Sequence, residues 1–218
     1  MKHIVVLLML VTIAWSCDTE QKVIDTGVSN PYFDGSIMEY LRAHKKNWDY
    51  TIQMIEHAGL VDLFEGNEEA YPEITFWAPP SYSIQRFILE SQKNQIPGEI
   101  YMTVNDIPQE LCRKYILMHV VKGKYLKEHI RYINKDYFIN DEKQDGGTDF
   151  ICLAGNILRA FLRTSSWAGV ADAGPVSLGL YSVTKGEGIT VATPDIQPLN
   201  GVVHALHYNY DFGKMCCE

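Results

Sequence analysis

The sequence has few of the patterns that mark a catalytic or metal-binding protein. It contains no GxSxG nucleophile turn, no phosphate-binding P-loop and no HExxH zinc motif. Its five cysteines form no CxxC pair and no Cys/His spacing of the zinc type. The sequence therefore predicts a protein that is not an enzyme and that uses no metal and no cofactor.

Basic residues are also scarce. The chain has 19 Lys and Arg against 27 Asp and Glu, which gives a formal net charge of −8. The densest basic runs, at 44–46 and 122–124, are short and have the spacing of solvated helix or turn residues. A protein that neutralises phosphates needs clustered Lys and Arg. We therefore expect no nucleic-acid partner.

The N-terminal apolar run is too short to be a comfortable membrane span. Lys2 precedes an apolar stretch at 4–11, and the small residues Ala14 and Ser16 follow it. This order is typical of a secretory signal, whereas a transmembrane helix needs about 20 predominantly apolar residues. Residues 1–16 are therefore predicted to be a signal peptide.

Cys17 directly after this segment resembles the acylated cysteine of a bacterial lipobox. The resemblance implies a palmitate-type lipid anchor on Cys17, and the alternative is a secreted protein in which Cys17 is incidental. The polar residues at 17–35 are typical of a tether between lipid and domain. Asp18 and Glu20 resemble the surface-export signals of some Gram-negative lipoproteins, which implies the outer membrane and an exposed location.

Four further cysteines could pair in an exported protein. We expect Cys112 and Cys152 to be free and buried, because the chain is long enough to bury a full core without disulfides. Cys216 and Cys217 lie in a predicted C-terminal tail at 213–218, and their pairing stays open.

The hydrophobic pattern predicts helices in the first half of the chain and strands in the second. Expected helices cover 36–48, 51–58, a segment from Ser81 and 108–118, and expected strands cover 74–78, 137–139, 150–153, 157–162, 176–183, 189–192 and a final strand reaching 210. No alternating strand–helix rhythm occurs, which favours the α+β class. A single domain at 36–212 fits the length, with a long insert at 164–188.

Three motifs in order resemble the fasciclin domain, an extracellular module. They are TFWAP at 75–79, LMHVVKG at 117–123 and NGVVH at 200–204. The resemblance implies a β-wedge of short strands with a group of helices from the N-terminal half. It also implies adhesion or binding rather than catalysis, because fasciclin domains are mostly adhesion or binding modules.

His119 and His204 lie inside these motifs, in apolar runs. A His can act as a general base or metal ligand, but here we expect each ring to be buried, donating one hydrogen bond to backbone and accepting another. Asn200 and Gly201 are expected to form a tight turn, since both tolerate positive φ. These four residues are therefore predicted to be structural.

Candidate binding residues lie elsewhere. Asp195 and Ile196 belong to TPDI at 193–196, which resembles, at Pro-Asp-Ile, a motif implicated in integrin binding by animal fasciclin members. Trp167 in the insert and Tyr82 are aromatic residues in or beside expected loops, where rings can stack on sugars or anchor a protein interface. The alternative is that these rings fill the edges of the core.

The sequence thus predicts a surface-anchored, non-catalytic module that recognises an extracellular protein or glycan. An alternative is an accessory lipoprotein that docks on an outer-membrane transporter for nutrient or glycan uptake. A hydrolase is a third reading, which would require a cleft beside His119 and His204.

Overall fold

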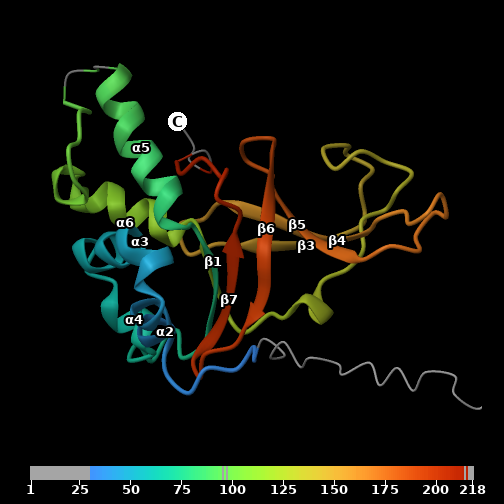
Figure 1. Ribbon diagram of the computed structural model, residues 1–218, viewed down its shortest axis with the longest axis horizontal. Coiled ribbons are helices and arrows are strands. Elements are labelled where there is room, and N and C mark those ends of the chain that lie inside the picture. The colour runs from blue at the N-terminus through green and yellow to red at the C-terminus, as the bar shows by residue number, and fades with distance from the viewer. Residues whose placement is uncertain (1–29, 95, 97, 214, 216–218) are drawn as a thin grey trace, which may run out of the picture. The chain divides into compact units, whose positions relative to one another are not determined.

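The computed structural model describes residues 30–94, 96, 98–213 and 215. The predicted signal peptide, Cys17, Cys216 and Cys217 lie outside the described residues. The helices are α2 (Ile37–Ala43), α3 (Lys45–His57), α4 (Val61–Glu65), α5 (Ser81–Asn94) and α6 (Gln109–Leu117), with short 3-10 turns η1 (Val104–Asp106) and η2 (Lys127–His129). The strands are β1 (Ile74–Ala78), β2 (Val120–Lys122), β3 (Thr148–Ile151), β4 (Ile157–Thr164), β5 (Val176–Ser182), β6 (Glu187–Ile196) and β7 (Gly201–Leu206) (Figure 1).

The strands form one mixed sheet of seven strands, in the order β2-β1-β7-β6-β5-β4-β3. β1 and β7 run parallel, and the other neighbours are antiparallel. The two edges meet, because Val121 bridges Cys152 and the Leu153 N–H donates to the Val120 carbonyl at 2.8 Å. The sheet therefore closes toward a barrel, which protects its edge strands from pairing with other chains.

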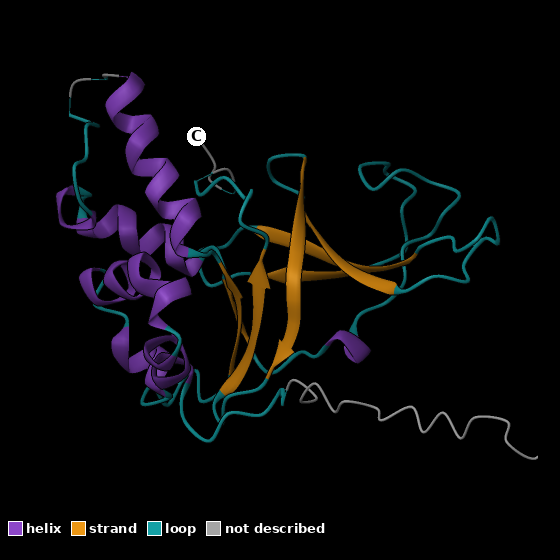
Figure 2. Ribbon diagram, viewed as in Figure 1, coloured by secondary structure: helices purple, strands orange, loops and turns teal. Residues whose placement is uncertain are grey.

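The helices gather beside β1 and β7, and β3 to β5 extend away from them (Figure 2). Helices thus pack on one side of an antiparallel-rich sheet, which confirms the α+β class predicted from the sequence.

β1 runs through the hydrophobic core, and all five of its residues are buried. Phe76 points to the helices, where its ring centroid lies 4.8 Å from that of Phe64 in α4. Trp77 points to the other face of the sheet, with its ring 4.5 Å from His204 and 6.3 Å from Phe150. Alternate side chains of a strand face opposite sides, so one short strand packs core side chains on both faces of the sheet.

The first helical region differs from the prediction at two points. The gap predicted between the helices at 36–48 and 51–58 is absent, because α3 runs through it. Ser36 caps α2 as expected, in a capping box with Glu39. The predicted helix at 36–48 is instead interrupted at His44, whose Nδ1 lies 2.9 Å from the Tyr40 carbonyl, and α3 begins at Lys45. No Gly or Pro marks this break, so the periodic pattern alone did not reveal it.

One predicted strand is absent, and another ends earlier than predicted. The strand at 74–78 is confirmed, but residues 137–139 form no strand, because the Tyr137 carbonyl is bound by the Gln144 side chain instead of a neighbouring strand. The final strand ends at Leu206, after which Tyr210 N–H bonds back to the His207 carbonyl in a turn.

Residues 31–35, assigned to the tether from the sequence, are hydrogen-bonded. Gln197 N–H donates to the Pro31 carbonyl at 2.7 Å, Phe33 N–H donates to the Gln197 carbonyl at 3.0 Å, and Leu199 N–H donates to the Gly35 carbonyl at 2.8 Å. The hydrogen-bonded part of the chain therefore begins before Ser36.

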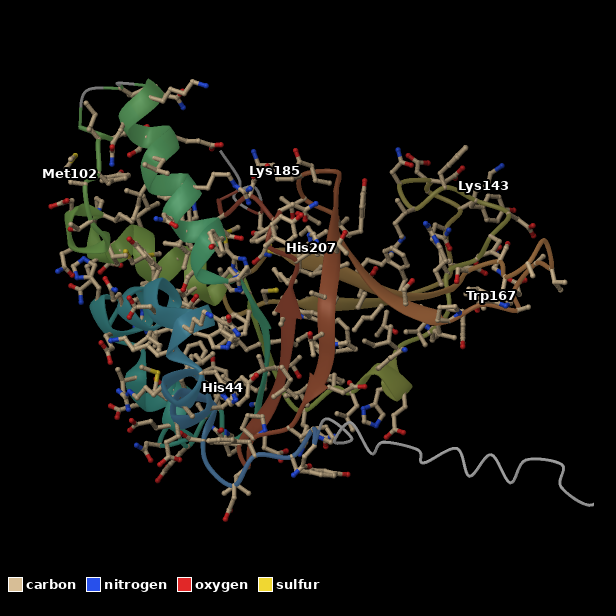
Figure 3. All side chains as sticks on the ribbon, in the orientation of Figure 1. His44, Met102, Lys143, Trp167, Lys185 and His207 are labelled. Atoms are coloured by element: carbon tan, nitrogen blue, oxygen red, sulfur yellow. The ribbon has the colours of Figure 1, made fainter. Side chains whose placement is uncertain are left out.

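Two long loops extend from β3, β4 and β5 on the side away from the helices. We call residues 131–147 and 165–175 the loop end; Figure 3 marks it with the labels of Lys143 and Trp167. An ion pair between Lys135 and Asp172 joins the two loops. The predicted insert at 164–188 therefore contributes only partly to loops, since it also supplies all of β5.

Candidate functional site

The three motifs that carry the fasciclin resemblance come together in the structure. Residues 75–79 are mostly β1, 117–123 end α6 and form β2, and 200–204 begin β7. These strands are direct neighbours in the sheet, with Trp77 opposite His204 in the β1–β7 register. The motifs thus build one continuous buried centre rather than three separate sites.

His204 is fully buried in that centre. Its Nε2 lies 2.9 Å from the Tyr125 carbonyl, and its Nδ1 accepts from the Asp195 N–H at 3.2 Å. The carbonyl can only accept, so Nε2 carries the proton of a neutral ring. Stacking against Trp77 covers one ring face.

His119 is buried in the second motif, with 1% of its surface exposed. Its Nδ1 lies 2.7 Å from the Tyr115 carbonyl, and its Nε2 lies 2.9 Å from the Tyr210 hydroxyl. Nδ1 therefore donates and Nε2 accepts. The imidazole ring stacks on the Phe212 ring, with 5.6 Å between the two centroids.

Burial changes the acid–base chemistry of His119, His204, Cys112 and Cys152. Desolvation lowers the pKa of His119 to about 4 and also lowers the pKa of His204. It raises the pKa of the Cys112 thiol to about 11 and that of Cys152 to about 12. Both cysteines are free and buried as expected. Neutral, solvent-shielded groups of this kind fit packing better than proton transfer or nucleophilic attack.

Asn200 and Gly201 act differently from the predicted positive-φ turn, because neither has a positive φ. The Asn200 side chain joins two helices to β7: Oδ1 accepts from the Ile37 N–H at 2.7 Å and Nδ2 donates to the Phe64 carbonyl at 3.0 Å. A Cβ on Gly201 would lie 2.0 Å from the Ile74 carbonyl oxygen. Gly is thus needed for close approach of the parallel strands.

Asp195 and Ile196 lie at an irregularity in β6, where the register with β7 shifts between Thr193 and Ile196. Asp195 has φ 62, and its carboxylate accepts from the Lys127 N–H at 2.7 Å. Ile196 packs against the core. The carboxylate that would recognise a receptor is therefore already engaged within the fold.

The two predicted aromatic residues are both exposed, but in different regions. Tyr82, at 69% exposure, lies near the start of α5, and Trp167, at 68%, lies in the loop end. Trp167 and Val170 close a tight hairpin by exchanging backbone hydrogen bonds of 3.0 and 2.9 Å. The structure does not bring Tyr82, Trp167 and Asp195 into one site.

Sequence reasoning missed the residue that organises the larger loop. Gln144 is 5% exposed. Its Oε1 accepts from the N–H groups of Asn134 and Gly146 at 3.0 and 2.9 Å, and its Nε2 donates to the carbonyls of Asn134 and Tyr137 at 2.8 and 2.9 Å. Phe138, next to this hub, is 82% exposed. A lone Gln in a polar stretch gives no local signal of such a role.

A cavity of about 290 Å³ opens beside this loop, lined among others by Lys135, Tyr137, Phe138 and Arg163. Arg163 comes from β4, and the other three come from the 131–147 loop. The cavity therefore combines two cations with two aromatic rings.

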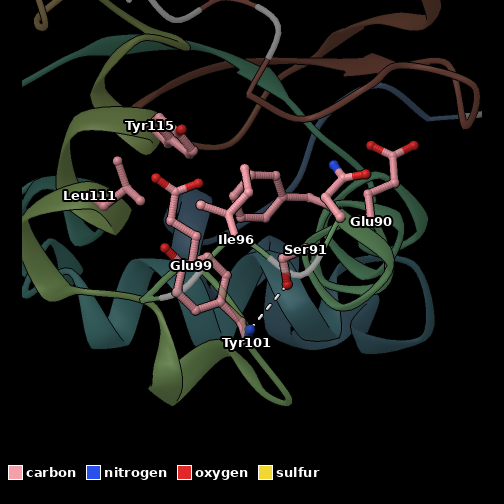
Figure 4. A pocket seen from close by; sticks show the side chains of 9 residues that line it. Glu90, Ser91, Ile96, Glu99, Tyr101, Leu111 and Tyr115 are labelled. Carbon is pink, nitrogen blue, oxygen red and sulfur yellow. Dashed lines mark hydrogen bonds between the residues drawn. The ribbon is translucent and has the colours of Figure 1, made fainter.

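A second cavity, of about 270 Å³, lies between α5 and α6 and has the opposite charge (Figure 4). Phe87, Leu111 and Tyr115 form its apolar wall, and Glu90 and Glu99 carry its carboxylates. Neither cavity is lined by His119 or His204, so the cleft that a hydrolase would need beside these rings is not among them.

The described residues contain no group of three or more His, Cys, Asp or Glu side chains placed to hold a metal ion. Within the same residues, no helix is both long enough and apolar enough to cross a membrane.

No known family model matches the chain, and no curated protein matches it. Among solved structures it is similar to a FAS1 domain pair from the insect cell adhesion molecule fasciclin I, with 16% sequence identity and a TM-score of 0.46. The similarity covers 73% of this chain and 43% of that one. The chain therefore spans less than half the length of this structure.

Proposed function

We propose that this protein is a non-catalytic binding module of fasciclin-like type, with the β-wedge of that family, which recognises an extracellular protein or glycan through its loop end. One observation carries the proposal. Phe138 and Trp167 are 82% and 68% exposed on loops that internal hydrogen bonds hold in place, whereas His119, His204 and both described cysteines are buried. Exposed rings on an ordered surface are typical of recognition.

The fasciclin-like assignment rests on the motifs and their placement. The three motif segments are adjacent strands that share one buried centre. In this proposal the protein is anchored through lipid on Cys17 to the outer membrane, and residues 17–30 separate the domain from the membrane surface. Labelling with a palmitate analogue would test the anchor, since Cys17→Ala should abolish both the label and sedimentation with membranes.

The binding proposal is tested with the intact acylated protein in detergent, on arrays of matrix proteins and glycans. A specific signal that Trp167→Ala together with Phe138→Ala abolishes, at unchanged thermal stability, would support it. Tyr208→Ala is a matched control, because Tyr208 is also exposed but follows β7, outside the loop end. A signal that survives the double substitution would contradict the assignment to the loop end.

The intact acylated protein also distinguishes adhesion from the alternative, an accessory role at an outer-membrane transporter. A pull-down from detergent-solubilised native membranes would recover an outer-membrane barrel protein while the arrays stay silent. Array binding without a membrane partner would instead favour adhesion. Hydrolysis of an array ligand by the wild-type protein would contradict the non-catalytic proposal.

A further inference from the structure

The cavity of the loop end has a charge that contrasts with the whole chain. The protein carries a formal net charge of −8, yet the described residues that line this cavity include Lys135 and Arg163 and no carboxylate. Such local reversal of sign attracts an anionic ligand and repels a cationic one.

Arg163 is the better placed of the two cations for direct pairing. It lies in β4 opposite Ser177 of β5, so its backbone is fixed by a strand ladder. Its guanidinium carbon lies 5.4 Å from the centroid of the Phe161 ring, and among the described residues it has no carboxylate partner. A guanidinium held in this way can bind a carboxylate through two parallel hydrogen bonds.

Lys135 differs, because it is paired with Asp172. An ammonium group has three donors, so the ion pair leaves donors available for hydroxyl groups. The same pair joins the two loops and holds the cavity wall in position.

The aromatic rings supply a second kind of contact. Tyr137 and Phe138 line the cavity and are 37% and 82% exposed. Gln144 fixes the backbone on both sides of them, since it binds the carbonyls of Asn134 and Tyr137 and the Gly146 N–H. The rings are thus presented by a preorganised loop, which lowers the entropy cost of binding.

A ligand that suits this cavity has a negative charge, an apolar face for the rings and hydroxyl groups for Lys135. An acidic sugar has all three. The cavity of about 290 Å³ is near the lower end of the range of about 300–1,000 Å³ for small-ligand sites, which suits one sugar ring. Building on the proposed function, we infer that the cavity formed by Lys135, Tyr137, Phe138 and Arg163 binds a carboxylated sugar residue of an acidic polysaccharide.

In this arrangement each group has a separate task. Arg163 pairs with the sugar carboxylate, Phe138 and Tyr137 cover the apolar face of the ring, and Lys135 donates to a hydroxyl. No bond forms or breaks, so the site requires no co-reactant.

The test measures binding of the full-length protein in detergent to polygalacturonate and hyaluronan, with dextran as a neutral polymer and dextran sulfate as one that is sulfated but carries no carboxylate. We expect binding to the two carboxylated polymers, weakening as salt rises, and no binding to dextran. Arg163→Gln should lower affinity at least tenfold, and Arg163→Lys should restore part of it, since charge returns but the two-point contact does not.

Two further variants show whether a loss of binding comes from the cavity or from misfolding. Phe138→Ala changes a ring that is 82% exposed, so it should weaken binding about tenfold at unchanged melting temperature. Arg42→Gln is the matched control, because it removes a half-exposed arginine of α2 that pairs with Glu56 and Glu65, and it should leave sugar binding unchanged.

Equal binding of dextran, or full binding by both Arg163→Gln and Phe138→Ala, would overturn the inference. So would a clear preference for the sulfated polymer, or binding of peptides alone. If the protein binds only peptides and this binding depends on Trp167, the proposed function stands and only the sugar inference fails. If binding is unaffected by Trp167→Ala together with Phe138→Ala, both the proposed function and the sugar inference fail.

Discussion

Trp77 and Trp167 show how differently two regions of this molecule use the same side chain. Trp77 lies in β1 at 0% exposure, stacked on His204, whereas Trp167 lies in the loop end at 68% exposure. Near the helices, aromatic rings fill the core on both faces of β1. In the loop end, hydrogen bonds and an ion pair replace the core, and the rings face solvent. The comparison teaches that an aromatic residue in the sequence does not by itself show whether the ring packs in the core or is exposed for binding.

The largest effect is expected where β1 and β7 approach each other. Gly201→Ala would place a methyl group 2.0 Å from the Ile74 carbonyl oxygen, which must shift with its strand. We expect a loss of about 3 kcal/mol or more in the free energy of unfolding, measured by denaturant titration. Gly188→Ala is the control, because a Cβ there meets nothing within 4 Å. Equal stability of the two variants would contradict the close parallel pairing.

The next largest effect is a loss of stability at acidic pH. The pKa of His119 is about 4 in the folded protein, because burial disfavours the charged ring, and 6.5 is the ordinary value. Between these values the unfolded chain binds a proton that the folded protein does not, so stability is full above pH 6.5 and falls as pH drops toward 4. The loss is about 3 kcal/mol by linkage.

Unfolding titrations from pH 7 to pH 4 would measure this loss, with His119→Gln as the comparison. The variant should show a weaker pH dependence, although His204, whose pKa is also lowered, contributes in the same direction. Asp106 and Asp149 have lowered pKa values, so their contributions are lost only below about pH 3.8. If the stability of His119→Gln falls with pH as steeply as that of the wild type, His119 does not cause the loss of stability between pH 6.5 and pH 4.

A smaller effect is expected in the loop end. Gln144→Ala would remove the partner of several backbone groups, and we expect a loss of about 1–3 kcal/mol. Hydrogen exchange should become faster in residues 131–147 and stay unchanged in β1 and β7, because the backbone groups that the Gln144 side chain binds lie within this loop. Acceleration in β1 would show that the loop and the buried centre unfold as one unit.

The smallest effect on stability is expected at the exposed ring. Trp167→Ala should change the free energy of unfolding by less than about 0.5 kcal/mol while weakening partner binding. Thermal melting and array binding of the same samples would measure both. A large drop in melting temperature would make Trp167 a core residue and remove the contrast with Trp77.

Local signals explain which structural predictions succeeded. Ser36 followed by Glu39 defines a capping box within four residues, and the apolar run at 74–78 before two prolines defines a buried strand. Residues 137–139 look like a strand because they are aromatic and branched, but the Gln144 side chain bonds their backbone. That contact depends on the path of the whole loop, so no short window could predict it.

Predictions about the candidate site divide in the same way. The expected burial of His119 and His204 followed from apolar neighbours, and their rings lie at 1% and 0% exposure. The role of Asp195 did not follow, because its partner, the Lys127 N–H, lies on a distant turn. The cavity between β4 and the 131–147 loop was likewise invisible in the sequence.

The sequence by itself determined the α+β class, the helix-rich first half and strand-rich second half of the chain, and the residues that form the buried centre. These features follow from caps, breakers and hydrophobic period, which act over a few residues. Only the tertiary structure decided why Gly201 must be Gly, which aromatic rings reach solvent and where cations collect in an acidic protein. Those properties arise from pairing between distant segments, such as β1 with β7 and Lys135 with Asp172, whose geometry exists only in the folded chain.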